Sequence, residues 1–223
     1  MSPHISHNTI EVRIHTREAE LQGFLTIPAD CRAIVVFAHG SGSSRFSSRN
    51  TYVAEILNDA SLATLLFDLL TAEENEIDMV TRELRFDIPL LTKRQIEVVD
   101  WLGQHDELNK LSPGLFGAST GSAAALGAAA ARPDVIKAVV SRGGRPDLVP
   151  KEDLQRVRAP TLLIVGGLDT QVIEMNEEAA GYLEVENKIE IVPGATHLFE
   201  EPGKLEEVGR LAREWFLAHL IEH

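Results

Sequence analysis

The stretch "GLFGASTGSAAALGAAAARP", residues 114–133, consists mostly of Gly and Ala and has a serine, Ser119, near its start. It begins as the short apolar run "GLFGAS" and continues as an alanine-rich segment that stops at Pro133. Continuous apolar runs of this length are typical of strands buried on both faces, and proline ends helices. The stretch therefore predicts a buried strand followed directly by a helix, with Ser119 at the turn.

Glycines stand two positions before and two positions after the serine, in Gly117-Ala118-Ser119-Thr120-Gly121. A tight strand-to-helix turn forces the serine into strained backbone geometry, and glycines on both sides leave room for the neighbouring backbone. The pattern also fits a flexible glycine loop or an anion-binding turn at a helix N-terminus. The strand before it and the helix after it favour an exposed nucleophile, the arrangement called a nucleophile elbow.

The rest of the chain alternates strand and helix patterns. Helical periodicity is visible over Ile88–Leu102 and Leu205–Phe216, and the segments "NTYVAEILNDA" and "TQVIEMNEEAAGYL" are typical of helices with polar outer faces. Strands are predicted around Val12 and Ile14, in "LQGFLTIP", and in the apolar runs that begin at Ala33, Leu62, Gly114, Ile136, Pro160 and Lys188. This alternation predicts an α/β fold, one domain over residues 1–223 with a mostly parallel sheet between helices.

The composition excludes some classes of partner. The chain has 223 residues, 44% of them hydrophobic and 25% charged, and a formal net charge of −13. Nucleic acids and anionic membranes need a basic face, so neither is an expected partner. The single cysteine, Cys31, excludes an internal disulfide, and neither a secretory signal nor a membrane-spanning apolar run is visible. We expect a soluble protein of the cytoplasm.

A serine nucleophile needs a general base, and the base needs an acid to orient it. Asp169 follows a predicted strand in "TLLIVGGLDT", and His197 follows the next one in "IEIVPGATHLF". Loops at the carboxyl ends of parallel strands converge on one rim of the sheet, where ligands bind. We therefore expect Ser119, Asp169 and His197 to meet there. Asp147, in "GGRPDL", is the alternative for the acid.

A third element is a loop that could stabilise negative charge. The segment "IVVFAHGSGSSRFSSRN" is a predicted strand that ends in His39-Gly40 and continues into a loop of Gly and Ser. Such a loop can direct a backbone N–H at an oxyanion. The backbone amides of Ser41 and Thr120 are the predicted oxyanion hole, with Gly42 as the alternative to Ser41.

Arginines stand near the same rim in this acidic chain. Arg142 and Arg145 stand at the end of a predicted strand in "SRGGRPDL", and Arg85 opens the helix before the elbow. One interpretation is that Arg142, together with Arg85, binds a carboxylate on the substrate. The other, which we favour, is that these arginines pair with local acids such as Asp87 and Asp147 and hold loops in place.

The His39-Gly40 loop, "GASTG", "GGLDT" and "GATHLF", in this order and spacing, resemble the α/β-hydrolase superfamily, most closely the dienelactone hydrolase-like group. The resemblance implies an eight-stranded, mostly parallel sheet, a Ser/Cys–His–Asp triad and no cofactor. Dienelactone hydrolases proper use a cysteine nucleophile, whereas position 119 is serine. This departure favours an ordinary carboxylic ester over a dienelactone as substrate.

Two function hypotheses follow. The first is a serine hydrolase that cleaves a small carboxylic ester or lactone through an acyl-enzyme. The second is a non-catalytic ligand-binding or scaffold protein on the same fold. Only seventeen residues, Gly143–Ala159, separate two strand signals, too few for a cap domain. The sequence shows no metal-ligand spacing and no Gly-x-Gly-x-x-Gly after the early strands, so no metal is expected.

Overall fold

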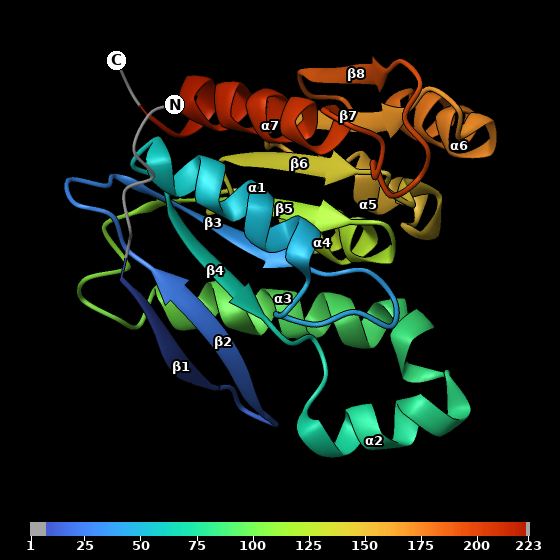
Figure 1. Cartoon of the computed structure of the whole chain (residues 1–223). Coiled ribbons are helices and arrows are strands. Elements are labelled where there is room, and N and C mark those ends of the chain that lie inside the picture. The colour runs from blue at the N-terminus through green and yellow to red at the C-terminus, as the bar shows by residue number, and fades with distance from the viewer. Residues whose placement is uncertain (1–7, 222–223) are drawn as a thin grey trace.

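Short apolar runs form the strands of one sheet in the computed structural model, which describes residues 8–221. The sheet has eight strands in the order β1-β2-β4-β3-β5-β6-β7-β8 (Figure 1). The strands are β1 (Thr9–His15), β2 (Glu20–Thr26), β3 (Ala33–Ala38), β4 (Ala63–Phe67), β5 (Ser112–Ala118), β6 (Ala138–Arg142), β7 (Thr161–Gly166) and β8 (Asn187–Val192). All eight lie where the sequence predicted strands.

The sheet is mostly parallel. Strand β2 pairs antiparallel with both β1 and β4, and the pairings from β4 through β8 are parallel. The carboxyl ends of β3 to β8 therefore point to the same rim, on the right in Figure 1. The loops that carry the predicted site residues all leave the sheet at this rim.

Helices cover both faces of the sheet. One face packs against α1 (Ser48–Asp59) and α7 (Lys204–Leu220), and the other against α3 (Ile88–Leu102), α4 (Thr120–Ala131) and α6 (Thr170–Ala180) (Figure 1). Two apolar clusters result, because successive side chains of a strand point to opposite faces. In β6, for example, Val139 packs in the cluster with α3 and α4, and Val140 in the cluster with α1 and α7.

The segment between β4 and α3 contains two helices that were not predicted from the sequence. After β4 the chain forms α2 (Ala72–Thr81) and the short 3₁₀ helix η1 (Leu84–Phe86) before α3 begins at Ile88. Helix α2 starts with a capping box in which Thr71 and Glu74 satisfy each other's backbone amides. Its outer face exposes Ile77, Met79 and Val80, so the helix lacks the apolar stripe that periodicity detects.

The connection from β6 to β7 holds only the 3₁₀ helix η2 (Pro146–Leu148) and α5 (Lys151–Leu154). The prediction of an α/β-hydrolase fold without a cap domain is confirmed. Residues 1–7 and 222–223, the ends of the predicted domain, lie outside the described residues. Within residues 8–221, no helix combines the length and the hydropathy that crossing a membrane requires.

Candidate active site

Ser119 joins the end of β5 to the start of α4 in a strained conformation. Its φ of 52° and ψ of −122° lie in a region that L side chains rarely adopt. A Cβ at Gly117 would lie 2.4 Å from Ser122 Cα, and one at Gly121 would lie 2.3 Å from the carbonyl oxygen of Ala38. Glycine at both positions therefore lets α4 start directly against the sheet, which keeps the turn tight.

The structure brings Ser119, His197 and Asp169 together. The Ser119 Oγ lies 3.2 Å from His197 Nε2, and His197 Nδ1 lies 2.6 Å from Asp169 Oδ2. Because the carboxylate can only accept, Nδ1 carries the proton and Nε2 is free to accept from the serine hydroxyl. The three side chains form one continuous chain of hydrogen bonds at the rim.

A second glycine contact lies at His197. Gly143, directly after β6, has a φ of +52°, and a Cβ there would lie 3.4 Å from His197 Cε1 and 3.1 Å from the His197 carbonyl oxygen. The loop that carries His197 is held by Glu201, whose carboxylate accepts from the Thr196 amide at 3.1 Å. The ring therefore packs on the backbone that directly follows β6, the neighbour of the nucleophile strand.

The alternative acid, Asp147, has a different partner. Both of its carboxylate oxygens accept from the Arg145 guanidinium at 2.8 Å. His197 is thus hydrogen-bonded to Asp169, while Asp147 closes a local pair with the arginine two residues before it.

The loop after β3 touches the nucleophile. A Cβ at Gly40 would lie 3.3 Å from Ser119 Cβ. Within residues 8–221, the backbone N–H groups of Ser41, Gly42 and Thr120 donate to no protein acceptor. The predicted oxyanion amides and their alternative therefore have no partner within the protein.

A buried histidine anchors this loop. His39 Nε2 accepts from the Leu69 amide at 3.0 Å, and Nδ1 donates to the Gly40 carbonyl at 2.9 Å. Burial lowers the pKa of His39, so the ring is neutral at pH 7. His39 therefore connects the segment after β4 with the start of the loop after β3. The His-Gly pair at the end of β3 was the sequence signal for this role.

Ser122 links the elbow to the segment after β6, and the sequence analysis gave it no role. Its fully buried hydroxyl donates to the Ser119 carbonyl at 2.7 Å and accepts from the Arg145 amide at 2.8 Å. Gly143, which supports His197, belongs to the same segment. Ser122 thus connects the backbone of the nucleophile with the backbone under the base.

Arg85 lies in η1 and is engaged by Asp78. Its amide and Nε donate to the two carboxylate oxygens at 2.9 and 2.7 Å, and Nη2 donates to the Asp78 carbonyl at 3.1 Å. Asp87 does not pair with Arg85 but caps α3 by accepting from the Leu90 amide. The remaining Nη1 lies 3.0 Å from the position of a Cβ on Gly42, so Arg85 also borders the oxyanion loop.

Arg142 lies at the end of β6 and is almost fully buried, with 6% of its surface exposed. Its Nε has no hydrogen-bond partner. Among the described residues, no hydrogen bond or ion pair joins Arg142 to Arg85, so the structure does not bring these two predicted substrate-binding residues together.

The His197 side chain is 38% exposed, so the site is accessible from solvent. A cleft of about 650 Å³ lies between the β1–β2 hairpin, the loop after β3 and α2, but it is lined by neither Ser119 nor His197. It reaches the loop after β3 through His39 and Ser43. In the described part of the chain, no group of three or more His, Cys, Asp or Glu side chains could hold a metal ion.

Two solved structures show what this chain is similar to. The chain is 55% identical to a dienelactone hydrolase from Anabaena variabilis, and the match covers 96% of this chain and 99% of that one with a TM-score of 0.95. It is 18% identical to Est1E from Butyrivibrio proteoclasticus over 93% of this chain and 98% of that one, with a TM-score of 0.77. The second match shows the shared fold.

Among curated proteins, the chain is 53% identical over 210 residues to a Mycobacterium tuberculosis protein whose name assigns it provisionally as a phosphoribosyl transferase. The match covers 94% of this chain but 46% of the relative, so the chain spans about half the length of the curated relatives it matches. No protein-family model matches. On the identity and coverage shared with the Anabaena protein, the chain belongs to the dienelactone hydrolase-like α/β-hydrolases.

Proposed function

We propose that this protein is a serine hydrolase that cleaves a small carboxylic ester or lactone through an acyl-enzyme on Ser119. The observation that carries the proposal is the chain of hydrogen bonds from the Ser119 hydroxyl through His197 to Asp169. A serine hydroxyl is a weak nucleophile until a positioned base takes its proton. In this proposal His197 Nε2, 3.2 Å from the Ser119 Oγ, is that base.

In this mechanism Ser119 Oγ attacks the substrate carbonyl carbon while its proton moves to His197 Nε2. Asp169 stabilises the imidazolium that results. The tetrahedral intermediate collapses, the C–O bond to the alcohol breaks, and His197 returns the proton to the departing alkoxide. Water then attacks the acyl-enzyme with His197 as base, which releases the acid and restores Ser119.

The negative oxygen of the intermediate needs donors that are already oriented. We assign this role to the amides of Thr120 and Ser41, with Gly42 as the alternative to Ser41. Their lack of protein acceptors supports the assignment, because an amide without a partner gains most from a developing oxyanion. The backbone strain of Ser119 lies next to these amides. Such strain is common at sites where function requires a fixed geometry.

The substrate should be small, and no cofactor enters the steps above. The exposure of the His197 side chain and the short connection from β6 to β7 favour a substrate that is bound at the rim rather than enclosed. Serine in place of the cysteine of dienelactone hydrolases proper supports an ester or simple lactone. The cytoplasmic location stays a prediction from the sequence.

The name of the mycobacterial relatives does not alter the proposal. That name belongs to proteins of which this chain matches less than half. A serine, a histidine and a carboxylate joined by hydrogen bonds are the arrangement that acyl transfer uses. The alternative to hydrolysis is a ligand-binding or scaffold protein that retains the arrangement without turnover.

The test is active-site labelling. A fluorophosphonate probe should modify the folded protein once per chain, at Ser119 by peptide mass spectrometry, and a series of p-nitrophenyl esters of increasing acyl length should then define the acyl preference. Ser43→Ala, on the neighbouring loop, is the matched control and should be labelled normally. A folded protein that is neither labelled nor active on any ester would favour the ligand-binding alternative.

A further inference from the structure

Strand β8 forms one edge of the sheet, and alternate residues of the strand have backbone groups that β7 does not use. The ladder with β7 is fixed at both ends, because the Thr161 amide donates to the Glu186 carbonyl at 2.9 Å and the Gly167 amide to the Val192 carbonyl at 2.8 Å. In a parallel ladder every second residue of a strand turns its N–H and C=O to the same neighbour. The even-numbered residues of β8 therefore bond to β7. The odd-numbered residues direct their N–H and C=O groups away from the sheet: Asn187, Ile189 and Ile191.

The outer side of β8 is uncovered by other strands. Within residues 8–221 no strand pairs with it, and it lies at the top edge of the sheet in Figure 1. A free edge is a template for pairing with another strand, and proteins commonly protect it with proline, with a bulge or with charged side chains. Strand β8 contains no proline and pairs with β7 without a bulge. Its charged side chains therefore decide which strand can pair with this edge.

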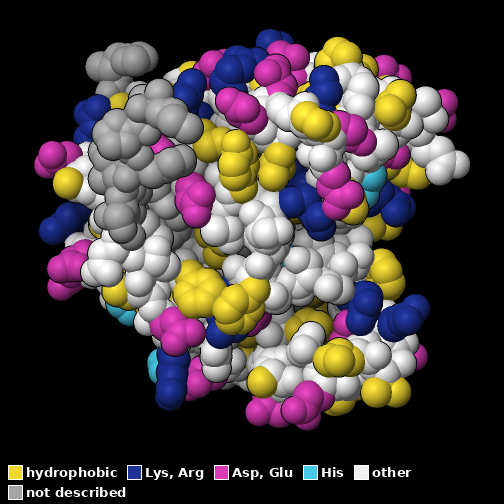
Figure 2. Space-filling model, in the orientation of Figure 1, with side chains coloured by type: hydrophobic (Ala, Val, Ile, Leu, Met, Phe, Trp, Pro, Cys, Tyr) yellow, Lys and Arg dark blue, Asp and Glu magenta, His cyan; other side chains and the backbone are white. Residues whose placement is uncertain are grey.

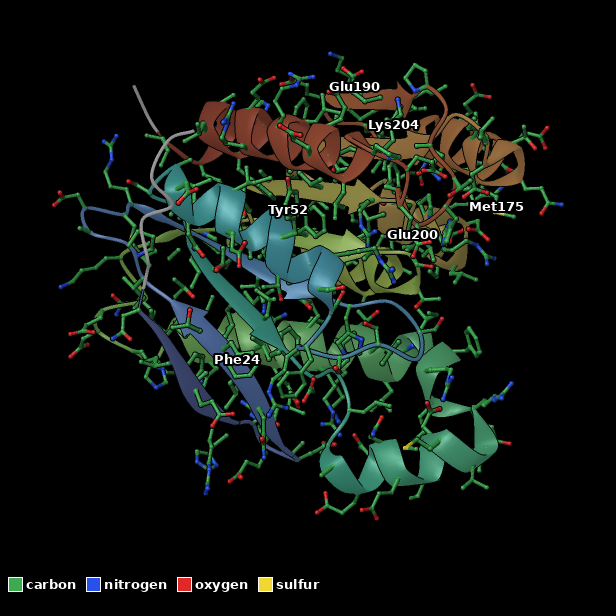
Figure 3. All side chains as sticks on the ribbon, in the orientation of Figure 1. Phe24, Tyr52, Met175, Glu190, Glu200 and Lys204 are labelled. Carbon is green, nitrogen blue, oxygen red and sulfur yellow. The ribbon has the colours of Figure 1, made fainter. Side chains whose placement is uncertain are left out.

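The two charged side chains of β8 have opposite signs and lie on the same face. Lys188 and Glu190 are two residues apart and form an ion pair, with side chains that are 62% and 29% exposed. Figure 3 labels Glu190 at this edge of the sheet. A surface pair of this kind contributes little to stability, so both groups can exchange partners at small cost. A basic and an acidic side chain at this spacing match a second strand that presents the two charges in the reverse order.

A second copy of β8, running antiparallel, presents that reverse order. With Ile189 of the two copies opposite each other, Lys188 of each copy faces Glu190 of the other, and Asn187 faces Ile191. The residues with outward backbone groups then form hydrogen-bonded pairs, each of which exchanges two hydrogen bonds. Lys188 and Glu190 form the non-hydrogen-bonded pairs, in which side chains approach most closely. The register that the charges select is therefore the register that the backbone groups require.

Apolar side chains support the same pairing on the opposite face of the strand. Ile191 is 43% exposed, and Ile189 is partly buried. In the antiparallel register Ile189 meets its own copy at the centre, and pairs of β-branched side chains across strands stabilise a sheet. Figure 2 shows hydrophobic, basic and acidic side chains side by side at the top of the view, where β8 lies.

We propose that this protein forms a homodimer in which the two β8 strands pair antiparallel about a twofold axis at Ile189, so that one sheet continues through both copies. The inference does not depend on the proposed hydrolase function. The same surface is used by both copies, so the assembly closes at two and does not propagate through this edge. The other edge strand, β1, fits less well, because its Glu11 pairs with Arg45 of its own chain.

Charge reversal tests both the surface and the register. Sedimentation equilibrium should show the wild type as a dimer. Lys188→Glu puts acids opposite Glu190 of the other copy, and Glu190→Lys puts bases opposite Lys188. Each change should weaken association roughly a hundredfold or more, because like charges then face one another across the interface. Lys110→Glu and Glu107→Lys, exposed changes of matched charge on the loop before β5, are the controls and should dimerise as wild type does.

Mixing the two reversed variants separates charge matching from damage to the strand. Lys188→Glu mixed with Glu190→Lys should form a heterodimer, since every charged pair is again of opposite sign. The double exchange Lys188→Glu/Glu190→Lys should restore the homodimer for the same reason. Single variants that dimerise like wild type, or that stay monomeric when mixed, would overturn the proposal. A wild type that is still monomeric at about 100 µM would overturn it as well, because association weaker than this is too weak for a specific dimer.

Hydrogen exchange then tests whether the contact lies on the strand edge. In wild type the amides of Asn187, Ile189 and Ile191 should exchange more slowly at high protein concentration than at low, because the monomer leaves them exposed to water. In Lys188→Glu alone they should exchange rapidly at both concentrations. Exchange that is equally fast in the monomer and in the dimer of wild type would place the contact elsewhere and overturn the pairing of the two β8 strands.

Discussion

Two polar clusters border the loop after β3, and they differ in what they leave free. The Ser119–His197–Asp169 chain ends on a hydroxyl at the rim, next to Gly40. In the Asp78–Arg85 pair, next to Gly42, the carboxylate is 3% exposed, and both of its oxygens accept hydrogen bonds from Arg85. A cluster whose polar groups all bind one another stabilises the fold. A cluster that ends on a hydroxyl with no further acceptor can use that hydroxyl in a reaction. Activity and stability should therefore be separable between the two.

The largest effect is expected at the end of the first cluster. Ser119→Ala should lower kcat for p-nitrophenyl acetate by about a millionfold, because the nucleophile is removed. The melting temperature should be unchanged, since one oxygen is lost from a turn fixed by backbone geometry. Steady-state kinetics and thermal unfolding of the same preparation measure both. Near wild-type turnover in the purified variant would refute the assignment of Ser119.

Asp169→Asn should lower kcat by about ten thousandfold, because an amide cannot hold the productive tautomer of His197 or stabilise the imidazolium. Asp147→Asn is the matched control, a carboxylate on the same rim that pairs only with Arg145, and it should retain activity. If Asp147→Asn were the damaging change, the acid would have to be reassigned.

The second cluster should respond in stability instead. Asp78→Ala leaves the Arg85 guanidinium without its partner, and breaking a buried pair in this way costs about 3–5 kcal/mol of unfolding free energy. Urea denaturation measures the loss. The kcat of the folded variant should fall far less than that of Asp169→Asn. A large loss of kcat without loss of stability would mean that Arg85 acts on the substrate rather than on the fold.

The same pair predicts a pH dependence. Burial alone would raise the pKa of Asp78, but hydrogen bonds from the Arg85 amide and guanidinium outweigh it, and the pKa lies below the ordinary value of 3.8. Since the folded pKa is depressed, the stabilisation is present above pH 3.8 and is lost as the pH falls through the folded value. Thermal unfolding between pH 5 and pH 2 should therefore show wild type and Asp78→Ala converging at the acid end; a constant difference would contradict the linkage.

The smallest effect is expected at Ser122, which belongs to neither cluster but lies under the first. Ser122→Ala removes a hydroxyl that accepts from the Arg145 amide, at a cost of about 1–2 kcal/mol in unfolding free energy. The kcat should fall by roughly tenfold or less with KM unchanged, because the Ser119 backbone loosens without losing its nucleophile. A rise in KM alone would indicate a binding role.

Much of the fold was accessible from the sequence because buried strands carry their own signal. The apolar runs from Ala33, Leu62 and Pro160 lie in sheet strands, and the amphipathic pattern of 88–102 corresponds to α3. Helix α2 was not predicted because its outer face is apolar and its single buried residue is an acid, Asp78. The capping-box spacing from Thr71 to Glu74 was the signal available for its start.

For the site, strand-end placement predicted that three distant residues would meet, and the structure brings Ser119, Asp169 and His197 within hydrogen-bond reach. The partners of the arginines were less accessible. Arg85 was expected to pair with Asp87 and pairs with Asp78, seven residues before it. Ser122 gave no sequence signal beyond being a small polar residue in the first helical turn.

The sequence by itself determined the parallel sheet, the elbow and the order of the site residues, because strand burial, glycine spacing and loop position are local properties of the chain. Only the tertiary structure decided which charges are satisfied. Arg85 and Arg142 look alike in sequence, each near an acid and a predicted rim, yet one is saturated by Asp78 and the other is buried without a partner. The physical reason is that a charge is satisfied by whichever groups the packed elements bring within a few ångströms, and those groups come from helices and loops whose positions no local pattern specifies.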